Sequence, residues 1–316
     1  MHPAFSVIFL TTLIGVGQGL FLALYAAELG AAFGLLAAPH AQRFFAAGSA
    51  LSLAFLAAGL LASFFHLGHP ERAWRSAAMW RTSWLSREVI ALPSFMAAVL
   101  AYGVAHYLGF GVTLMLGALG ALLCFALFIC TAMIYACLKF LQEWATPLTV
   151  INYALLGSAS GFTFAAAFAA SAVSADSTLV GVLVYCALIL TVSALCTRVA
   201  SLIRNSRLKP KSSLQTAIGI KHPRIAQKTQ GFMGGSFNTR EFFHGQPPQV
   251  LLAVKWGFLA LVFPAPLVLL LAGESWSSAF LLEAAFAFQF LGLIAERWFF
   301  FAQANHPQNL YYQAIS

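Results

Sequence analysis

Apolar residues run along the chain in eight long blocks, separated by short stretches rich in Pro, Gly and polar residues. A bilayer core needs about 20 apolar residues per α-helix, and each block is about that long. The blocks predict membrane-spanning helices at residues 5–29, 43–65, 89–108, 110–138, 150–173, 178–203, 250–272 and 277–301. The sequence therefore predicts an all-α polytopic integral membrane protein with eight transmembrane helices, the seventh kinked at Pro264 and Pro266.

The composition agrees with this pattern. Hydrophobic residues make up 61% of the 316 residues and charged residues only 8%, which is more apolar surface than a soluble core of this size could bury. Met1, His2 and Pro3 lead directly into the first apolar block, without the charged start and small-residue cleavage site of a signal peptide. We therefore expect the first helix to be retained.

The charges are distributed unevenly between the two sides of the predicted membrane protein. With eight spans, both termini and the connections 2–3, 4–5 and 6–7 share one side, which carries sixteen of the seventeen Lys and Arg residues. Arg43 alone falls on the other side. Because Lys and Arg favour cytoplasmic loops, both termini are predicted to be cytoplasmic. We expect two four-helix bundles, residues 1–138 and 139–316, the second with a cytoplasmic loop at 204–249.

Several kinds of site are not expected. The five cysteines show no spacing typical of zinc or iron–sulfur ligation, so no metal site is predicted. His40 and His106 are predicted at the membrane surface opposite the other histidines, which leaves no pair to hold a haem within the bilayer. The basic residues lie beside the apolar blocks, where membrane lipid explains them better than nucleic acid does.

The connection between the second and third spans concentrates polar chemistry in residues 64–90. His66 is predicted where the second helix leaves the bilayer and Glu88 where the third returns, so both would face one cytoplasmic mouth. A His and a carboxyl there could hydrogen-bond a bound carbonyl and deliver protons to it. Arg72 and Arg75 would add positive charge that stabilises an anion developing on a bound ring. Trp74 and Trp84 could wall an aromatic pocket.

Each of these residues also has a plainer interpretation. The Arg residues could serve only to set topology, and the Trp residues could be interfacial anchors. His66 could cap a helix, and Glu88 could be a first-turn residue favoured by the helix dipole. Five uncharged polar residues inside the predicted spans are interpreted as scattered packing groups, so no proton pump is predicted: Thr11, Thr12, Gln18, Asn152 and Gln289.

The long loop at 204–249 is basic and rich in turn residues, with aromatic side chains between its charges. Exposed aromatic and Arg residues are typical of interface hot spots. The loop is therefore interpreted as a docking surface for a partner, although a solvated loop that meets anionic headgroups is the alternative. The predicted partner-binding residues are Phe232, Phe237, Arg240, Phe242 and Phe243.

Four segments resemble one protein family: HPAFSVIFLTTLIGVGQGLFLAL at the start, FHLGHPERAWR, WLSRE, and GFMGGSFNTREFFHG in the long loop. Together they are similar to the DmsC-type membrane anchors of the NrfD-like superfamily, over essentially the whole chain. Within that family the chain looks most like the anchors of quinone-linked sulfite dehydrogenases. Matched residue by residue, the family's functional positions fall on His66, Gly68, Arg72 and Glu88.

The resemblance implies a heterotrimer in the bacterial inner membrane, with both partners on the cytoplasmic side. A molybdopterin catalytic subunit and an iron–sulfur subunit with [4Fe–4S] clusters would carry the metal cofactors, and this chain would hold a ubiquinone or menaquinone without haem. It would be the quinone-reducing subunit of a sulfite dehydrogenase. The alternatives are the anchor of a dimethyl sulfoxide reductase that oxidises menaquinol and, from another class, a secondary transporter.

Overall fold

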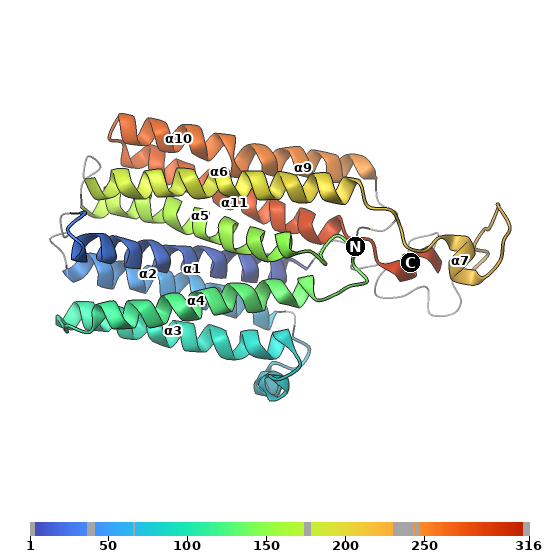
Figure 1. Ribbon diagram of the computed structural model, residues 1–316, viewed down its shortest axis with the longest axis horizontal. Coiled ribbons are helices and arrows are strands. Elements are labelled where there is room, and N and C mark those ends of the chain that lie inside the picture. The colour runs from blue at the N-terminus through green and yellow to red at the C-terminus, as the bar shows by residue number, and fades with distance from the viewer. Residues whose placement is uncertain are drawn as a thin grey trace.

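The computed structural model describes residues 4–36, 42–65, 67–173, 178–229, 243, 245 and 247–311. Long helices lie side by side along one common direction (Figure 1). The helical elements are α1 (Phe5–Ala32), α2 (Gln42–Phe64), η1 (Pro70–Met79), α3 (Trp84–Leu108), α4 (Thr113–Ala136), α5 (Pro147–Ala172), α6 (Thr178–Ser206), α7 (Leu214–Ile218), α9 (Pro248–Val262), α10 (Pro264–Ser275), α11 (Ala279–Ala302) and η2 (Pro307–Tyr311).

Eight segments are long and apolar enough to cross a membrane, which confirms the predicted number of spans. The seventh is broken, because α9 ends at Val262 and α10 begins at Pro264. Proline has no backbone N–H and its ring clashes with the preceding turn, so a helix interior cannot continue through it undisturbed. The predicted disturbance of the seventh helix is confirmed.

The third span begins earlier than predicted. Ser83 is the N-cap of α3, and its side chain accepts a hydrogen bond from the backbone N–H of Ser86. The helix therefore starts at Trp84, five residues before the apolar block, since a cap and not hydrophobicity decides where it begins. Glu88 consequently lies in the second turn of α3, inside the helix.

Helices α1 and α5 lie at the centre of the bundle and are its most buried spans. They approach closely where glycines face each other, at Gly15 and Gly157 and at Gly19 and Gly161. Small residues allow such close backbone contact, which is how membrane helices gain packing energy. Helix α1 also contacts α2, α4 and α11, so it connects the first half of the chain to the second. The division into two four-helix bundles stays a prediction.

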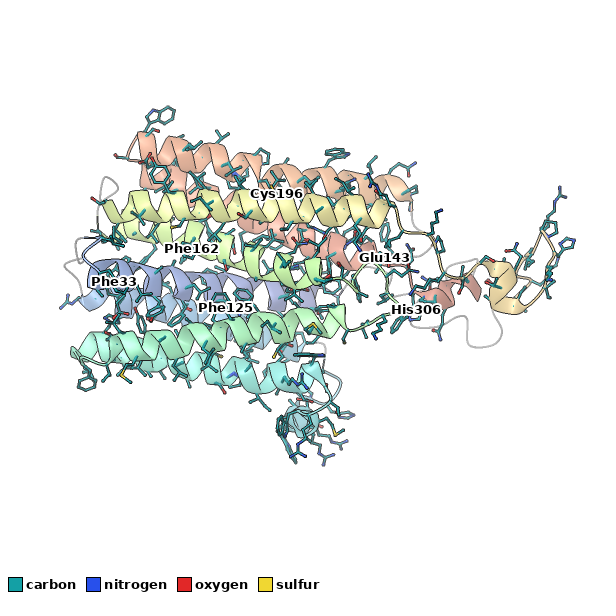
Figure 2. All side chains as sticks on the ribbon, viewed as in Figure 1. Phe33, Phe125, Glu143, Phe162, Cys196 and His306 are labelled. Atoms are coloured by element: carbon teal, nitrogen blue, oxygen red, sulfur yellow. The ribbon has the colours of Figure 1, made fainter. Side chains whose placement is uncertain are left out.

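The bundle has two distinct ends. At one end α1 and α3 begin, α2, α4, α6 and α11 end, and α7 projects beyond the spans; we call it the α7 end, and the opposite one the far end (Figure 1). Glu143 lies at the α7 end and Phe33 at the far end (Figure 2). The elements that carry the predicted cytoplasmic charges thus share one end, as eight alternating spans require. Which membrane side the α7 end faces stays a prediction.

Candidate functional site

The polar connection between α2 and α3 folds into η1, which projects sideways from the α7 end of the bundle (Figure 1). Pro70 begins this element, and none of its side chains is buried. Trp74 is 71% exposed. Arg72 is also exposed, and its Nε lies 3.7 Å from an Oε of Glu71. Arg72 and Trp74 therefore lie on the surface of the protein and line neither of the cavities described below.

Two further residues of the predicted mouth precede η1. His66 lies outside the described residues, so its predicted proximity to Glu88 stays a prediction. Gly68 is exposed, and an added Cβ would meet no atom within 4 Å. A larger side chain at position 68 would therefore clash with nothing in this chain, so packing within the chain does not explain why this residue is glycine.

Arg87, in the first turn of α3, hydrogen-bonds to the end of the polar connection. Its Nε donates to the backbone oxygen of Trp80 at 2.9 Å, and its Nη2 donates to that of Arg81 at 2.8 Å. The guanidinium also lies 4.2 Å from the ring centroid of Trp84, a cation–π contact. Trp84 is half-buried beneath Arg87, one turn before Glu88.

Glu88 is the one acidic residue of α3, and its side chain is buried in the bundle at 8% exposure. The hydroxyl of Thr131 on α4 donates a hydrogen bond to its Oε1. An ionisable side chain buried in a membrane-spanning helix is costly and is usually kept for function. Glu88 is therefore the strongest of the predicted site residues.

A narrow cavity lies between α1, α4, α5 and α11, with room for about one water molecule. Its polar lining comprises Thr11, Thr12, Gln18, Thr131, Tyr153, Ser160 and Arg297. We call it the inner cavity. Thr11, Thr12 and Gln18 were predicted to be scattered packing groups; they are not scattered, because the fold gathers them around one space. Thr131 joins the inner cavity to Glu88, since its hydroxyl binds the carboxyl.

A cluster of buried charges lies beside the inner cavity. Arg198 on α6 places its Nε 2.8 Å from one oxygen of Glu296, and Arg297 places Nη1 3.3 Å from the other. All three side chains are at most 5% exposed. The guanidinium carbon of Arg297 also lies 3.7 Å from the ring centroid of Tyr153 on α5. Two cations and one carboxylate leave this cluster with one surplus positive charge.

A second narrow cavity lies between α5, α6, α11 and the connection before α5, again with room for about one water molecule. Its polar lining comprises Glu143, Thr149, Asn152, Tyr153, Arg198, Ser201, Asn205, Glu296, Arg297 and Gln303. We call it the outer cavity. The Asn152 amide is fixed there, because it donates to Ser201 at 2.9 Å and accepts from Thr197 at 2.8 Å. The inner and outer cavities share Tyr153 and Arg297.

Sequence reasoning overlooked Arg198 and Arg297, which count there only as charges of the cytoplasmic side. The sequence did contain a sign of their role, because each arginine interrupts an apolar block. Arg198 lies well before the end of α6 at Ser206, and Arg297 lies before the end of α11 at Ala302. Charges at such positions are expensive in a bilayer and point to a partner or a function. Glu296 directly precedes Arg297 in the sequence, but spacing along the chain does not indicate that Glu296 also pairs with Arg198 or that Tyr153 lies nearby.

The far end of the bundle holds a separate pair of a histidine and a carboxyl side chain. His106 Nε2 on α3 lies 3.3 Å from an Oε1 of Glu28 on α1, and both side chains are about one-tenth exposed. The imidazole ring stacks on Phe45 with centroids 4.5 Å apart. His106 thus lies at the end opposite η1 and α7, as predicted, and partners a carboxyl there.

The predicted docking residues of the long loop are described only in part. Phe232, Phe237, Arg240 and Phe242 lie outside the described residues. Phe243 is 8% exposed, and its ring packs against Trp298 of α11 with centroids 5.2 Å apart. The structure therefore places Phe243 within the bundle's apolar packing. Across the described ranges, no three His, Cys, Asp or Glu side chains gather where they could hold a metal ion.

Comparisons with known proteins agree with one another. The sequence profile of a family described as "DMSO reductase anchor subunit (DmsC)" matches residues 1–220. The chain is also 55% identical over 329 aligned residues to one of the sulfite dehydrogenase subunits of Allochromatium vinosum. That alignment covers 100% of both chains. The similarity thus extends over the eight spans and the buried charge cluster alike.

Proposed function

Because the chain belongs to the DMSO reductase anchor subunit (DmsC) family, we propose that it is the membrane anchor and quinone-reactive subunit of a molybdenum and iron–sulfur oxidoreductase. Sulfite would be oxidised on the catalytic partner, and its electrons would pass to the quinone pool through this chain. The relative named as a sulfite dehydrogenase subunit supports sulfite, because it matches the chain from end to end. The family description alone would equally suit a dimethyl sulfoxide reductase.

The metal cofactors of the proposed complex belong to its partners. A molybdopterin subunit would oxidise sulfite, and a subunit with [4Fe–4S] clusters would carry the electrons to the membrane. We place both on the cytoplasmic side, in contact with η1, α7 and the long loop of this chain. The localisation follows as the bacterial inner membrane, with the α7 end facing the cytoplasm, because the excess of Lys and Arg lies at that end.

The observation that carries the quinone proposal is the buried carboxyl of Glu88, held by Thr131 near the α7 end. A ring seated there would lie close to an iron–sulfur partner and within reach of an acid that can donate a proton to its carbonyl oxygen. We propose His66, Gly68 and Trp84 as the other walls of this mouth. Arg72 and Trp74, exposed on η1, would cover it from the aqueous side.

Binding of a quinone analogue to membranes that contain the complete complex tests this assignment. A hydrogen bond to an ionisable group contributes about 1.5–3 kcal/mol, so Glu88→Gln should weaken analogue binding by roughly 10–100-fold and slow quinone reduction by sulfite. Glu283→Gln is the matched control, because Glu283 accepts a hydrogen bond from Ser171 on an exposed part of the bundle. His66→Ala is measured in the same way.

Unchanged affinity and turnover in Glu88→Gln would remove Glu88 from the quinone site. Loss of the partner subunits from the membrane in that variant would instead indicate that Glu88 supports assembly. The content of iron–sulfur clusters in the membranes, measured by absorbance, separates these two outcomes.

A further inference from the structure

We propose that the inner and outer cavities form a proton-supply path from the α7 end to Glu88, with Tyr153 and Arg297 at their junction. This inference rests on the proposed quinone reaction and assigns a role to residues that lie outside the mouth. Both cavities are too narrow for a quinone ring, since each has room for about one water molecule. Their dimensions suit water and protons only.

The path begins at the ends of α6 and α11. Asn205 and Gln303 line the outer cavity in the last turn of α6 and directly after α11, and Glu143 joins them from the connection before α5. All three are partly exposed. Glu143 lies at the α7 end of the bundle (Figure 2). Protons can therefore reach the outer cavity from water on that side.

The outer cavity contains buried donors that the rest of the described chain does not satisfy. Nη2 of Arg198 and Nε2 of Gln303 are buried, and neither donates a hydrogen bond to another described group. Leaving a buried polar group without a partner costs about 1–3 kcal/mol, so such groups are usually bound to ordered water. This chemistry favours ordered water in the outer cavity, which both Arg198 and Gln303 line.

Tyr153 and Arg297 connect the two cavities. Both line each of them, and the guanidinium lies on the phenol ring. Tyr135 stacks on Tyr153 from the α4 side, with ring centroids 5.8 Å apart. The Tyr153 hydroxyl can both accept and donate a proton, so it can pass one from the outer to the inner cavity. Tyr153 is therefore a positioning and relay residue, and it would not touch quinone.

The path ends at Thr131, whose hydroxyl lines the inner cavity and binds Glu88. Toward the far end, Gln18 closes the inner cavity by donating to the backbone oxygen of Cys124 at 3.0 Å. The fully buried apolar rings of Phe21 and Phe95 lie between Gln18 and the Glu28–His106 pair of the far end, and Phe21 contacts Tyr102 beside that pair. Protons would consequently be taken up from the α7 end alone.

The charges of the cluster explain why Glu88 could release a proton inside the bundle. Arg198, Arg297 and Glu296 together carry one surplus positive charge, and Arg297 lies against the ring of Tyr153, which lines the same inner cavity as Thr131, the partner of Glu88. When Glu88 donates its proton, its negative charge balances that surplus. The four groups are then neutral together, which lowers the cost of a carboxylate in a poorly solvated site.

Conversion of a quinone to a quinol takes two electrons, which come from the iron–sulfur partner, and two protons. The O–H bond of Glu88 breaks as one forms on the nearer carbonyl oxygen, and the other carbonyl oxygen takes its proton from water at the mouth. The carboxylate is then reprotonated through Thr131 and the two cavities.

Tyr153→Phe in the complete complex tests the path, because it removes the hydroxyl and keeps the ring under Arg297. At saturating quinone and alkaline pH, turnover of this variant should fall by roughly tenfold. A direct proton donor contributes about 10²–10⁴-fold. The loss is expected to be smaller here because water can partly replace the relay. The loss should shrink as the pH falls, and the solvent deuterium isotope effect should rise. Quinone-analogue affinity should not change.

Two further variants make the result interpretable. Tyr102→Phe is the matched control, since Tyr102 is an equally buried tyrosine near the far-end pair and should leave the pH profile unchanged. Gln303→Leu, at the rim of the outer cavity, should reproduce the alkaline loss with little risk to folding.

The path is refuted if Tyr153→Phe and Gln303→Leu both keep the parent's pH profile and isotope effect while quinone reduction proceeds. If the parent complex does not bind quinone analogues at all, the proposed function fails first, and the two failures are therefore distinguishable.

Discussion

The crossing of α1 and α5 allows a stability prediction to be worked from distances. A Cβ added at Gly19 would lie 2.9 Å from the Cα atoms of Gly161 and Ser158, and it would overlap the carbonyl oxygen of Gly157. Carbon atoms pack best at about 3.5–4.0 Å, so Gly19→Ala leaves each contact roughly 0.6–1.1 Å too short. The obstructing atoms are backbone, so no side chain can rotate away and the two helices must separate.

Overpacking of a rigid site costs about 1–3 kcal/mol, and we expect the upper part of this range for Gly19→Ala. Gly257→Ala is the matched control, because Gly257 lies in the membrane-spanning α9 with nothing within 4 Å of an added Cβ. Both variants gain the same helix propensity, up to about 1 kcal/mol. Their difference in stability therefore isolates the helix crossing.

The assay is unfolding of the purified chain in mixed lipid and detergent micelles as the fraction of denaturing detergent rises, followed by tryptophan fluorescence. Gly19→Ala should unfold at a lower fraction than Gly257→Ala. Equal midpoints would refute the crossing geometry. Because Gly15 and Gly157 of the same crossing line the inner cavity, a separation of the helices should also alter the proton-supply path.

Two further predictions concern the arginines. Arg198→Met should destabilise the chain by about 1–3 kcal/mol, less than the about 3–5 kcal/mol of a fully unpaired buried charge, because Glu296 loses its closer partner at 2.8 Å but keeps Arg297. Unfolding in the same micelles measures this loss, and a neutral effect would contradict the assigned ion pair. Arg87→Lys should release the turn at Trp80 and Arg81 with little change in global stability, seen as faster hydrogen exchange there. Unchanged exchange would show that Arg87 does not fasten this turn.

The sequence by itself determined which segments span the membrane. Apolar length alone indicated eight helices, and Pro264 indicated the break in the seventh, because a bilayer demands a continuous hydrogen-bonded helix of fixed length. The same composition identified Glu88 as unusual, since a carboxyl so close to an apolar block requires a reason. The family resemblance rested on local motifs and likewise needed no structure.

Only the tertiary structure decided which side chains meet. Thr131 lies 43 residues from Glu88 along the chain, and Arg198 lies almost a hundred residues before Glu296. In a soluble helix an apolar stripe reveals the buried face, but a membrane helix is apolar on every side, so its pattern does not indicate which face meets a neighbour. The glycine crossing of α1 with α5 and the polar cavities beside it form only because these particular helix faces pack against each other.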